Sequence, residues 1–471
     1  MLIRQTVLYL PAQLLGPLAQ LVAIVLWTHW LDPDAFGLFT LAMAAQEAVY
    51  LLLLSFWSYF LLRFLPSADT ALRQRMDVIE TRLFLANAML QAAALLMLMR
   101  YVMHEWPSRE LLVVLFAFSF TRSYCTHLAE RARADGIVGT YTVLQTVGPV
   151  VGLLIGVLWA SLVPVEPMHV LASYAIAQTI SLILALPKLR VNFRLQAADP
   201  ATLHHAYRYG LPLAASGLLA WVPGNGSRFV VEHELGIAAV GMFSVGWTLG
   251  QRACSFAAML VTAAAFPLAL RLEASGARDR AMHQLSLNGV LLCSVLLPTV
   301  AGLILLTPAL TKVAVSEPYV AVTLQILPLA ALAGLVKNLR SHFANQAFLL
   351  AQKTNWTLAL DILETLLFLI GAAVGLRTLG VVGAAWGALI AVSVGALLAF
   401  AIAIGRLKMP FPGRHLLRIV LATAVMSLAL SVLPPLTGWM QLLAAVALGG
   451  LVYIATLALG YRGHLGKLRT L

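Results

Sequence analysis

The sequence predicts an all-α, polytopic membrane protein of about fourteen transmembrane helices. Of the 471 residues, 61% are hydrophobic and only 11% are charged, and the mean hydropathy is +0.90. Soluble domains hold about 25% charged residues, and a helix needs about 20 apolar residues to cross a bilayer. Apolar segments of that length follow one another along the whole chain. No stretch therefore remains for a separate soluble catalytic domain.

Fourteen apolar segments can be delimited along the chain. They span residues 5–30, 36–62, 79–103, 110–130, 138–162, 168–187, 209–233, 237–268, 285–308, 319–350, 355–375, 380–405, 415–434 and 438–460. The first is interpreted as a retained helix and not as a cleaved signal peptide, because its apolar run is long and no A-x-A cleavage site follows it.

Basic residues test this helix count, because they gather in the cytoplasmic loops of membrane proteins. Alternate junctions are rich in them: Arg4; Arg63, Arg73 and Arg75; Arg131 and Arg133; Lys188, Arg190, Arg194 and Arg208; Arg271, Arg278 and Arg280; Lys353; Arg406, Lys408, Arg414 and Arg418; Arg462, Lys467 and Arg469. The opposite junctions carry only Arg100, Arg109, Lys312 and Arg377. Both termini are therefore predicted to be cytoplasmic. The net charge of +12 is interpreted as this topological signal, not as a nucleic-acid-binding face.

An internal repeat divides the chain. LDPDAFGLF at residues 31–39 matches LGIAAVGMF at residues 235–243 in four of nine positions, at an offset of 204 residues. The offset equals six predicted helices, and an even number makes the two copies parallel. The predicted domains are an N-lobe at 1–204 (helices 1–6), a C-lobe at 205–408 (helices 7–12), and helices 13–14 with a cytoplasmic tail at 409–471.

The seventh segment is broken near its middle. Proline removes a backbone donor and glycine loosens a helix, and membrane helices tolerate either only where neighbouring groups satisfy the freed carbonyls. The hinge candidates at this break are Pro223, Gly224 and Gly226. Small residues also serve as tight packing contacts between membrane helices, which is the alternative interpretation.

Arg228 follows this break. An arginine inside a membrane helix costs at least ~2.5 kcal/mol, so it is expected to face a bundle interior or a wet cavity. There it is a candidate contact for substrate phosphate. The alternative is snorkelling to the outer surface with Glu232 or Glu234 as its partner.

Arg252 lies near the middle of the eighth segment, with long apolar runs on both sides. From that depth it does not easily reach water, so it is the leading candidate for a cavity-facing phosphate contact. Glu47 lies at the corresponding depth of the second segment, and the repeat places it opposite Gln251. Glu47 and Arg252 are expected to meet across a cavity, either as a structural ion pair or as a pair that opens when phosphate takes the arginine.

The tenth and eleventh segments add four charged candidates. Lys337 and Arg340, three residues apart, share a helix face in the inner half of the membrane and are further phosphate candidates. Snorkelling to lipid headgroups is the alternative. Asp361 and Glu364 either pair with these cations, which is preferred, or bind a coupling H⁺ or Na⁺. Arg122 on the fourth segment is interpreted mainly as an anchor at the membrane surface and is an additional phosphate candidate.

Other polar and aromatic residues are interpreted as anchors at the membrane surfaces. On the third and fourth segments these are Glu80, Arg82, Tyr124 and His127. An aromatic belt is expected near the outer ends of the helices at Trp27, Trp30, Trp106 and Trp439.

Four stretches, taken in order, resemble a known family: residues 8–44 (beginning LYLPAQLLGPLAQ), 209–252 (YGLPLAASGLLAWVPGNGSRF), 263–276 (AAAFPLALRLEASG) and 345–369 (NQAFLLAQKTNW). They are similar to oligosaccharide flippases of the polysaccharide transporter family, in the multidrug/oligosaccharidyl-lipid/polysaccharide exporter superfamily. Many relatives carry an acidic residue directly before the midpoint arginine, where this chain has Ser227.

The resemblance implies two six-helix lobes in a V around a central cavity, followed by two extra helices. It also implies flipping of undecaprenyl-diphosphate-linked oligosaccharide across a bacterial inner membrane by alternating access, for lipopolysaccharide or exopolysaccharide synthesis. The expected partners are the lipid-linked substrate, membrane lipids, and a polysaccharide polymerase with other assembly proteins. No nucleic acid is expected.

Three other functions fit the sequence less well. No GxxxxGK[ST], HExxH or CxxC motif occurs in the sequence, so no cofactor or metal is expected. The expected energy source is an ion gradient, the membrane potential or removal of product on the far side. A membrane polymerase or ligase would need polar catalytic residues in a large outer loop. A drug-cation exporter would need an acidic cavity, whereas the intramembrane charge here is mainly basic. A lipid II flippase is the nearest alternative.

Overall fold

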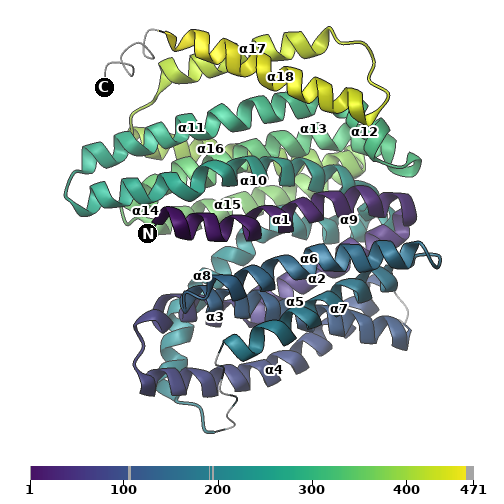
Figure 1. Cartoon of the computed structure of the whole chain (residues 1–471), viewed down its shortest axis with the longest axis vertical. Coiled ribbons are helices and arrows are strands. Elements are labelled where there is room, and N and C mark those ends of the chain that lie inside the picture. The colour runs from purple at the N-terminus through teal and green to yellow at the C-terminus, as the bar shows by residue number, and fades with distance from the viewer. Residues whose placement is uncertain (1, 104–107, 190, 192, 194–195, 463–471) are drawn as a thin grey trace. The chain divides into compact units, whose positions relative to one another are not determined.

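The computed structural model describes residues 2–103, 108–189, 191, 193 and 196–462 (Figure 1). Several residues used above therefore lie outside the described part: Trp106, Arg190, Arg194, Lys467 and Arg469. The chain forms two compact units, Met1–Gly241 and Met242–Leu471. The boundary between these units, after Gly241, lies further along the chain than the boundary at 204/205 that the repeat predicts. The units are defined by compactness and the lobes by repeat symmetry, so the structure does not test the lobes and they stay a prediction.

All regular secondary structure in the described part of unit 1 is helical. They are α1 (Leu2–Trp30), α2 (Pro33–Leu53), α3 (Ser55–Phe64), η1 (Leu65–Ser67), α4 (Thr70–Met103), α5 (Arg109–Ala134), α6 (Val138–Ala160), α7 (Pro167–Ala185), η2 (Leu186–Lys188), α8 (Pro200–Trp221), η3 (Val222–Gly226) and α9 (Ser227–Leu235). α10 (Ile237–Ala274) begins in unit 1 and continues into unit 2.

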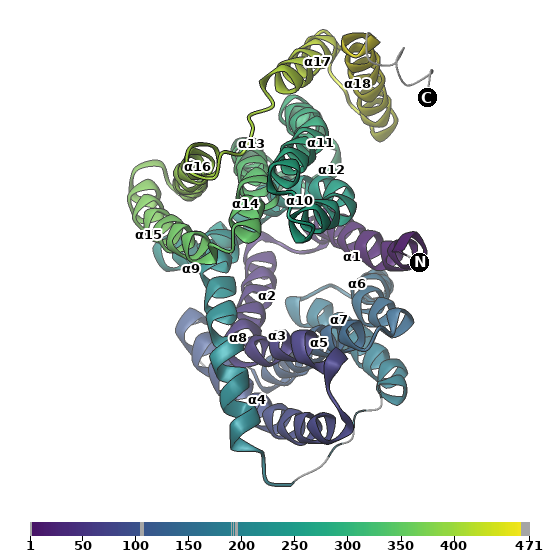
Figure 2. The ribbon, with the colours of Figure 1, turned by 90° about the vertical axis from the view of Figure 1, so that its left-hand side faces the viewer.

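Unit 2 continues in the same way. Its further helices are α11 (Arg278–Leu305), α12 (Thr307–Ala314), α13 (Glu317–Leu339), η4 (Arg340–Ala344), α14 (Asn345–Leu350), α15 (Thr354–Leu379), α16 (Val381–Gly405), α17 (Gly413–Ser431) and α18 (Trp439–Gly460). Figure 2 shows α15 beside α16 and α17 beside α18, and α17 also packs against α11. α17 and α18 are the two extra helices expected at 409–471.

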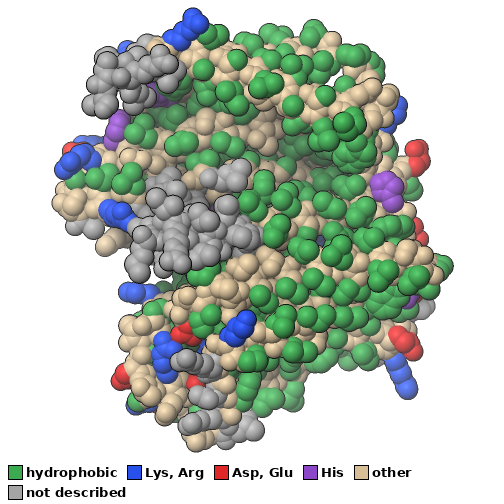
Figure 3. All heavy atoms as spheres, viewed as in Figure 1, with side chains coloured by type: hydrophobic (Ala, Val, Ile, Leu, Met, Phe, Trp, Pro, Cys, Tyr) green, Lys and Arg blue, Asp and Glu red, His purple; other side chains and the backbone are tan. Residues whose placement is uncertain are grey.

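The predicted helix count is confirmed. Within the described residues, eleven helices are long and apolar enough to cross a membrane. Three more segments of similar length complete the set of fourteen: α1, the interrupted helix from α8 to α9, and α10. Figure 3 shows hydrophobic side chains over the visible face of these helices, with most charged side chains towards the helix ends. The chain is a multi-pass membrane protein.

Ion pairs join the basic junctions of unit 1. Arg73, after η1, pairs with Asp135, after α5, at 2.9 Å. Arg75 lies 3.5 Å from Asp199, which precedes α8. Hydrogen bonds from Thr202 hold the pKa of Asp199 below its ordinary value. Three junctions that alternate along the chain therefore lie at one end of unit 1, as the positive-inside pattern predicts.

The repeated motifs meet in a reciprocal contact. α2 begins at Pro33 and α10 at Ile237, which is the repeat offset. A Cβ added to Gly37 would lie closer than 3.0 Å to the Ile237 carbonyl oxygen, and one added to Gly241 would lie equally close to that of Pro33. Gly37 therefore packs on Ile237, and Gly241 packs on Pro33, which is the repeat equivalent of Ile237. An exchange of equivalent contacts of this kind is expected at a two-fold axis. Only residues without a Cβ allow this approach.

The aromatic belt prediction is wrong for one residue. Trp27 is 1% exposed, and its indole N–H donates to the Tyr174 hydroxyl at 3.3 Å. The ring also lies on Gly156 of α6, where a Cβ would clash with it. Trp27 is therefore a packing residue between α1, α6 and α7. Trp30 and Trp439 are 38% and 49% exposed, which agrees with positions at the protein surface.

Candidate functional site

The predicted break in the seventh span is a π-helical segment, η3 (Val222–Gly226). A π-helical turn leaves backbone groups outside the regular α-helical ladder, and such segments are frequent at functional sites. Pro223 and Gly226 are buried there, and a Cβ on Gly226 would lie 3.1 Å from the Trp221 ring. The structure thus shows both the interruption and tight packing. A hinge role for Pro223, Gly224 and Gly226 stays a prediction.

Arg228 begins a polar bridge between α9 and α2. Its Nη1 donates to Asn225 Oδ1 at 2.6 Å, and Asn225 Nδ2 donates to Glu47 Oε2 at 2.7 Å. Asn225 belongs to η3, so the interrupted segment provides the residue that joins the two charges. Arg228 is only 6% exposed. This burial argues against the snorkelling interpretation.

Ser227 stands directly before Arg228, where the family resemblance implies an acidic residue. Its hydroxyl donates to the Gly224 carbonyl at 2.9 Å, and the side chain is buried. Asn225 links Arg228 to the carboxylate of Glu47, on another helix. Asn225 could not be recognised from the sequence, because an amide near a helix break is equally compatible with a local turn.

A second π-helical segment, η4, begins with Arg340. Arg340 pairs through Nη2 with Asp361 at 2.5 Å and through Nη1 with Glu364, both on α15. The three side chains are buried or nearly so. The predicted pairing of Asp361 and Glu364 with the tenth span is confirmed for Arg340. Gly395 of α16 leaves the necessary room, because a Cβ there would lie 3.1 Å from Glu364 Oε2.

Lys337 lies one turn before Arg340 on α13, within electrostatic reach of Glu364. It is partly buried, which is compatible with both a cavity-facing and a snorkelling side chain. Arg122 on α5 is also partly buried, and its guanidinium lies 6.0 Å from the Phe118 ring centroid. Phosphate binding by Lys337, Arg340 and Arg122 stays a prediction.

Arg252 lies on the face of α10 that points away from α13. Gly250 and Cys254 pack on α13, at Ala330 and Ala331 respectively. At about 100° per residue, Arg252 is about 200° around the helix from Gly250. It is partly buried. Its contact with Glu47 stays a prediction.

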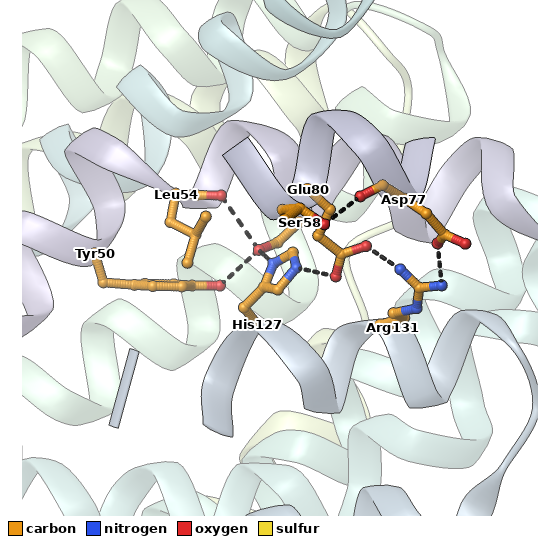
Figure 4. Close-up of polar contacts among 8 residues, drawn as sticks. Tyr50, Leu54, Ser58, Asp77, Glu80, His127 and Arg131 are labelled. Carbon is orange, nitrogen blue, oxygen red and sulfur yellow. Dashed lines mark hydrogen bonds and ion pairs between the residues drawn. The ribbon is translucent and has the colours of Figure 1, made fainter. Parts of the chain in front are cut away.

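Unit 1 contains a buried polar network that was not predicted from the sequence as a functional site (Figure 4). Ser58 Oγ lies 2.7 Å from His127 Nδ1, and His127 Nε2 lies 2.9 Å from Glu80 Oε1. Arg131 pairs with Glu80 and, at 2.6 Å, with Asp77. The side chains of His127 and Glu80 are 0% exposed.

Glu80 and His127 are therefore not surface anchors, and that prediction is wrong. Asp77 and Glu80 are one turn apart on α4, as are His127 and Arg131 on α5. Such spacings put each pair on one helix face, and the two faces meet. The spacings were visible in the sequence, but only the packing of α4 on α5 shows that these faces are turned inward.

Comparisons with known proteins identify the protein family and the fold. A family model described as polysaccharide biosynthesis protein matches residues 2–273. No curated protein sequence matches the chain significantly. Among solved structures, the lipid II flippase MurJ in an inward closed conformation is similar, with a TM-score of 0.76 and 13% identity, covering 98% of this chain and 100% of that chain.

Two further structures share the fold. An inward-facing multidrug resistance MATE family transporter of the MOP superfamily has a TM-score of 0.66 and 16% identity, covering 85% of this chain and 98% of that one. A MOP superfamily transporter from Pyrococcus furiosus has a TM-score of 0.58 and 15% identity, covering 86% and 95%. These matches confirm the family resemblance and the helical transporter fold. The chain belongs to the polysaccharide biosynthesis protein family and has the fold of the MOP superfamily of transporters.

Proposed function

We propose that the protein flips undecaprenyl-diphosphate-linked oligosaccharide from the cytoplasmic to the periplasmic leaflet of a bacterial inner membrane. The observation that carries this proposal is the match to the polysaccharide biosynthesis family over residues 2–273. The likeness of nearly the whole fold to a lipid-linked precursor flippase supports it. Both termini are proposed to be cytoplasmic, from the alternation of basic junctions.

The chain's own residues supply cations at membrane depth for such a substrate. A diphosphate loses its hydration on entering a bilayer, and arginine offsets that cost by bidentate hydrogen bonds to phosphate oxygens. Arg252, in the middle of α10 and turned away from α13, is the leading candidate for this contact. Arg228 is a second candidate, because it lies inside the interrupted seventh span, directly after the π-helical segment.

Transport is proposed to proceed by alternating access. In this scheme the polyprenyl tail stays in lipid while the sugar diphosphate enters from the cytoplasmic side and leaves on the other. Transport needs no covalent chemistry, so the protein is proposed to act as a transporter and not as an enzyme. A polysaccharide polymerase and other assembly proteins are its proposed partners.

Deletion of the gene followed by complementation tests the proposal. The deletion strain should accumulate cytoplasm-facing lipid-linked oligosaccharide and lose its surface polysaccharide, and the wild-type gene should reverse both effects. Arg252→Ala, at normal protein level, should leave the intermediate accumulated. Arg278→Ala, at an exposed position at the start of α11, is the matched control and should restore export.

A second candidate function is flipping of lipid II, favoured by the structural match to the lipid II flippase over 98% of this chain. Expression in a strain depleted of its own lipid II flippase separates the two. Growth rescue would favour lipid II as the substrate. Failure to rescue, together with loss of surface polysaccharide in the deletion strain, would favour the oligosaccharide.

A further inference from the structure

The network around His127 can satisfy its hydrogen bonds in two protonation states. Tyr50 donates to Ser58 Oγ at 3.0 Å, and Ser58 can donate either to the Leu54 carbonyl, 3.3 Å away, or to His127 Nδ1. With neutral His127, the Nε2 proton goes to Glu80 and Nδ1 accepts from Ser58. With protonated His127, Nδ1 donates to Ser58 Oγ, and the Ser58 proton turns to Leu54. One hydroxyl rotation therefore accommodates the change, without movement of heavier atoms.

A proton on His127 would lie in direct contact with a carboxylate. His127 Nε2 is 2.9 Å from Glu80 Oε1, and both side chains are 0% exposed. The Arg131 and Asp77 side chains beside them are only 4% and 6% exposed. Buried charges are costly unless they are paired, and an imidazolium at His127 is paired with Glu80.

Unit 2 contains a similar cluster with a different fourth member. In both clusters one arginine contacts an aspartate through Nη2 and a glutamate three residues later through Nη1. The arginine is Arg131 in unit 1, with Asp77 and Glu80, and Arg340 in unit 2, with Asp361 and Glu364. The basic residue nearby is Lys337. The cluster in unit 1 has a histidine in that role, and histidine is the side chain that changes charge near neutral pH.

A polar column continues beyond His127 along the interface of α4 and α5. Asn87 and Gln91 lie on α4 at turns that follow Glu80, and Ser123 and Ser119 lie on α5 at turns that precede His127. Ser123 accepts a hydrogen bond from Gln46 of α2 at 3.0 Å. The Gln91 amide and the Ser119 hydroxyl are buried and make no hydrogen bond within the described part of the chain. Buried, unpaired groups of this kind are the ones that ordered water satisfies.

The other end of the column approaches the basic end of unit 1. Arg131 lies one turn before Asp135, whose partner Arg73 has a side chain that is 41% exposed. Polar groups therefore continue from His127 and Glu80 to a solvent-accessible ion pair at this end of unit 1. Arg131 keeps its own proton, so it holds the Glu80 carboxylate in place and does not pass a proton on.

The helices that pack against α5 are α2, α3, α4, α6 and α7. The charged and titratable groups near His127 come from α2, α3, α4 and α5 itself. They are Tyr50 of α2; Tyr59 of α3; Asp77 and Glu80 of α4; and Tyr124, Glu130 and Arg131 of α5 itself. Glu130 is paired with Arg133 at 3.6 Å. α6 has no charged residue and α7 has only His169, which contacts the Glu166 backbone at 3.1 Å.

We propose that His127 and Glu80 form a proton-binding site inside unit 1, and that the proton bound there couples an ion gradient to transport. The proton is taken up from water on the imidazole, whose Nδ1–H then donates to Ser58 Oγ, and it is released to water when the imidazole returns to its neutral form. Proton binding stands on the network alone. Coupling to transport rests on the proposed function.

Histidine titration in the full-length protein tests the binding site without any substrate. The protein is labelled with ¹⁵N-histidine in lipid nanodiscs and titrated between about pH 5 and pH 9, the range in which histidine changes charge. The His127 resonance is the one missing in His127→Gln. Ser58→Ala, which removes the acceptor of the Nδ1 proton, identifies it by a shift if the first variant does not fold.

Glu80→Gln should lower the proton affinity of His127 by about tenfold or more, because a neighbouring carboxylate favours the imidazolium. Glu364→Gln, the equivalent change in the unit 2 cluster, should leave the His127 titration unchanged. The proposed site is overturned if His127 does not titrate in this range, or if Glu80→Gln leaves its titration where it was.

Transport in proteoliposomes tests the coupling. Lipid-linked oligosaccharide export should respond to an imposed pH gradient in the wild type and in Glu317→Gln, an exposed carboxylate at the start of α13, and should lose this response in Glu80→Gln. A retained response in Glu80→Gln would refute the coupling. If the wild type transports no lipid-linked oligosaccharide while His127 still titrates as expected, the proposed function fails and the proton-binding site stands.

Discussion

Gly37 and Gly241 lie against each other where the first turns of α2 and α10 cross. A Cβ added to Gly241 would lie 3.1 Å from the Gly37 amide nitrogen and closer than 3.0 Å to the Pro33 carbonyl oxygen. The two glycines are equivalent positions of the internal repeat. The short motif that identified the repeat in the sequence is therefore also the motif that forms this contact.

Gly241→Ala is expected to destabilise the protein. The obstacle is backbone and not a flexible side chain, so the helices must move apart, at a cost of about 1–3 kcal/mol. The measurement is the melting temperature in detergent, which should fall. Gly302→Ala on α11 is the control, because a Cβ there meets nothing within 4 Å. Equal melting of Gly241→Ala and wild type would show that α2 and α10 do not pack this closely.

Asn225→Ala is expected to weaken unit 1 by about 1–3 kcal/mol. The change leaves Glu47 without its amide donor and removes the Asn225 acceptor of Arg228. The measurement is again thermal melting in detergent. Gln325→Ala, which removes an exposed amide on α13, should melt like the wild type. If both variants behave alike, Asn225 does not bridge the two charges.

Arg340→Ala is expected to destabilise unit 2 by about 3–5 kcal/mol, because Asp361 and Glu364 would be left buried without their cation. Removing all three charges together, with Arg340→Met, Asp361→Asn and Glu364→Gln, should restore most of the loss. Melting of the single and triple variants checks this. A triple variant no more stable than Arg340→Ala would mean that the arginine stabilises through packing alone.

Arg252→Ala is expected to reduce export of lipid-linked oligosaccharide by about tenfold or more, since one hydrogen bond to a charged group contributes about 1.5–3 kcal/mol. A melting temperature close to that of the wild type would separate the loss of a substrate contact from a loss of stability. Export rate and melting are measured on the same preparation. Normal export by Arg252→Ala would remove this residue from the proposed substrate contact.

The helices and their number could be predicted from the sequence because hydropathy is a local property. A run of about 20 apolar residues must form its own backbone hydrogen bonds in a bilayer, whatever its neighbours are. The interruption at Pro223 was predictable for the same reason, since a missing backbone donor acts within its own helix. The second π-helical segment, at Arg340, has no proline and gave no such signal.

The contacts and burial of charged residues could be predicted less completely. The pairing of Arg340 with Asp361 and Glu364 followed from their spacing, and the structure shows it. Glu80 and His127 look like residues near the ends of helices, and nothing in their own segments shows that α4 and α5 turn them towards each other. Burial of a side chain depends on which helix packs against it, and that depends on the whole bundle.

The sequence by itself determined the membrane-spanning helices, the repeat and the family, because apolar length, loop charge and motif order are written along the chain. Only the tertiary structure decided which charges meet. It joined Glu47 to Arg228 through Asn225, and it enclosed His127 between Ser58 and Glu80. Apart from the local hydrogen bond between Arg228 and Asn225, these contacts link residues that are 47 to 178 positions apart. Packing brings such residues together, and no local pattern specifies it.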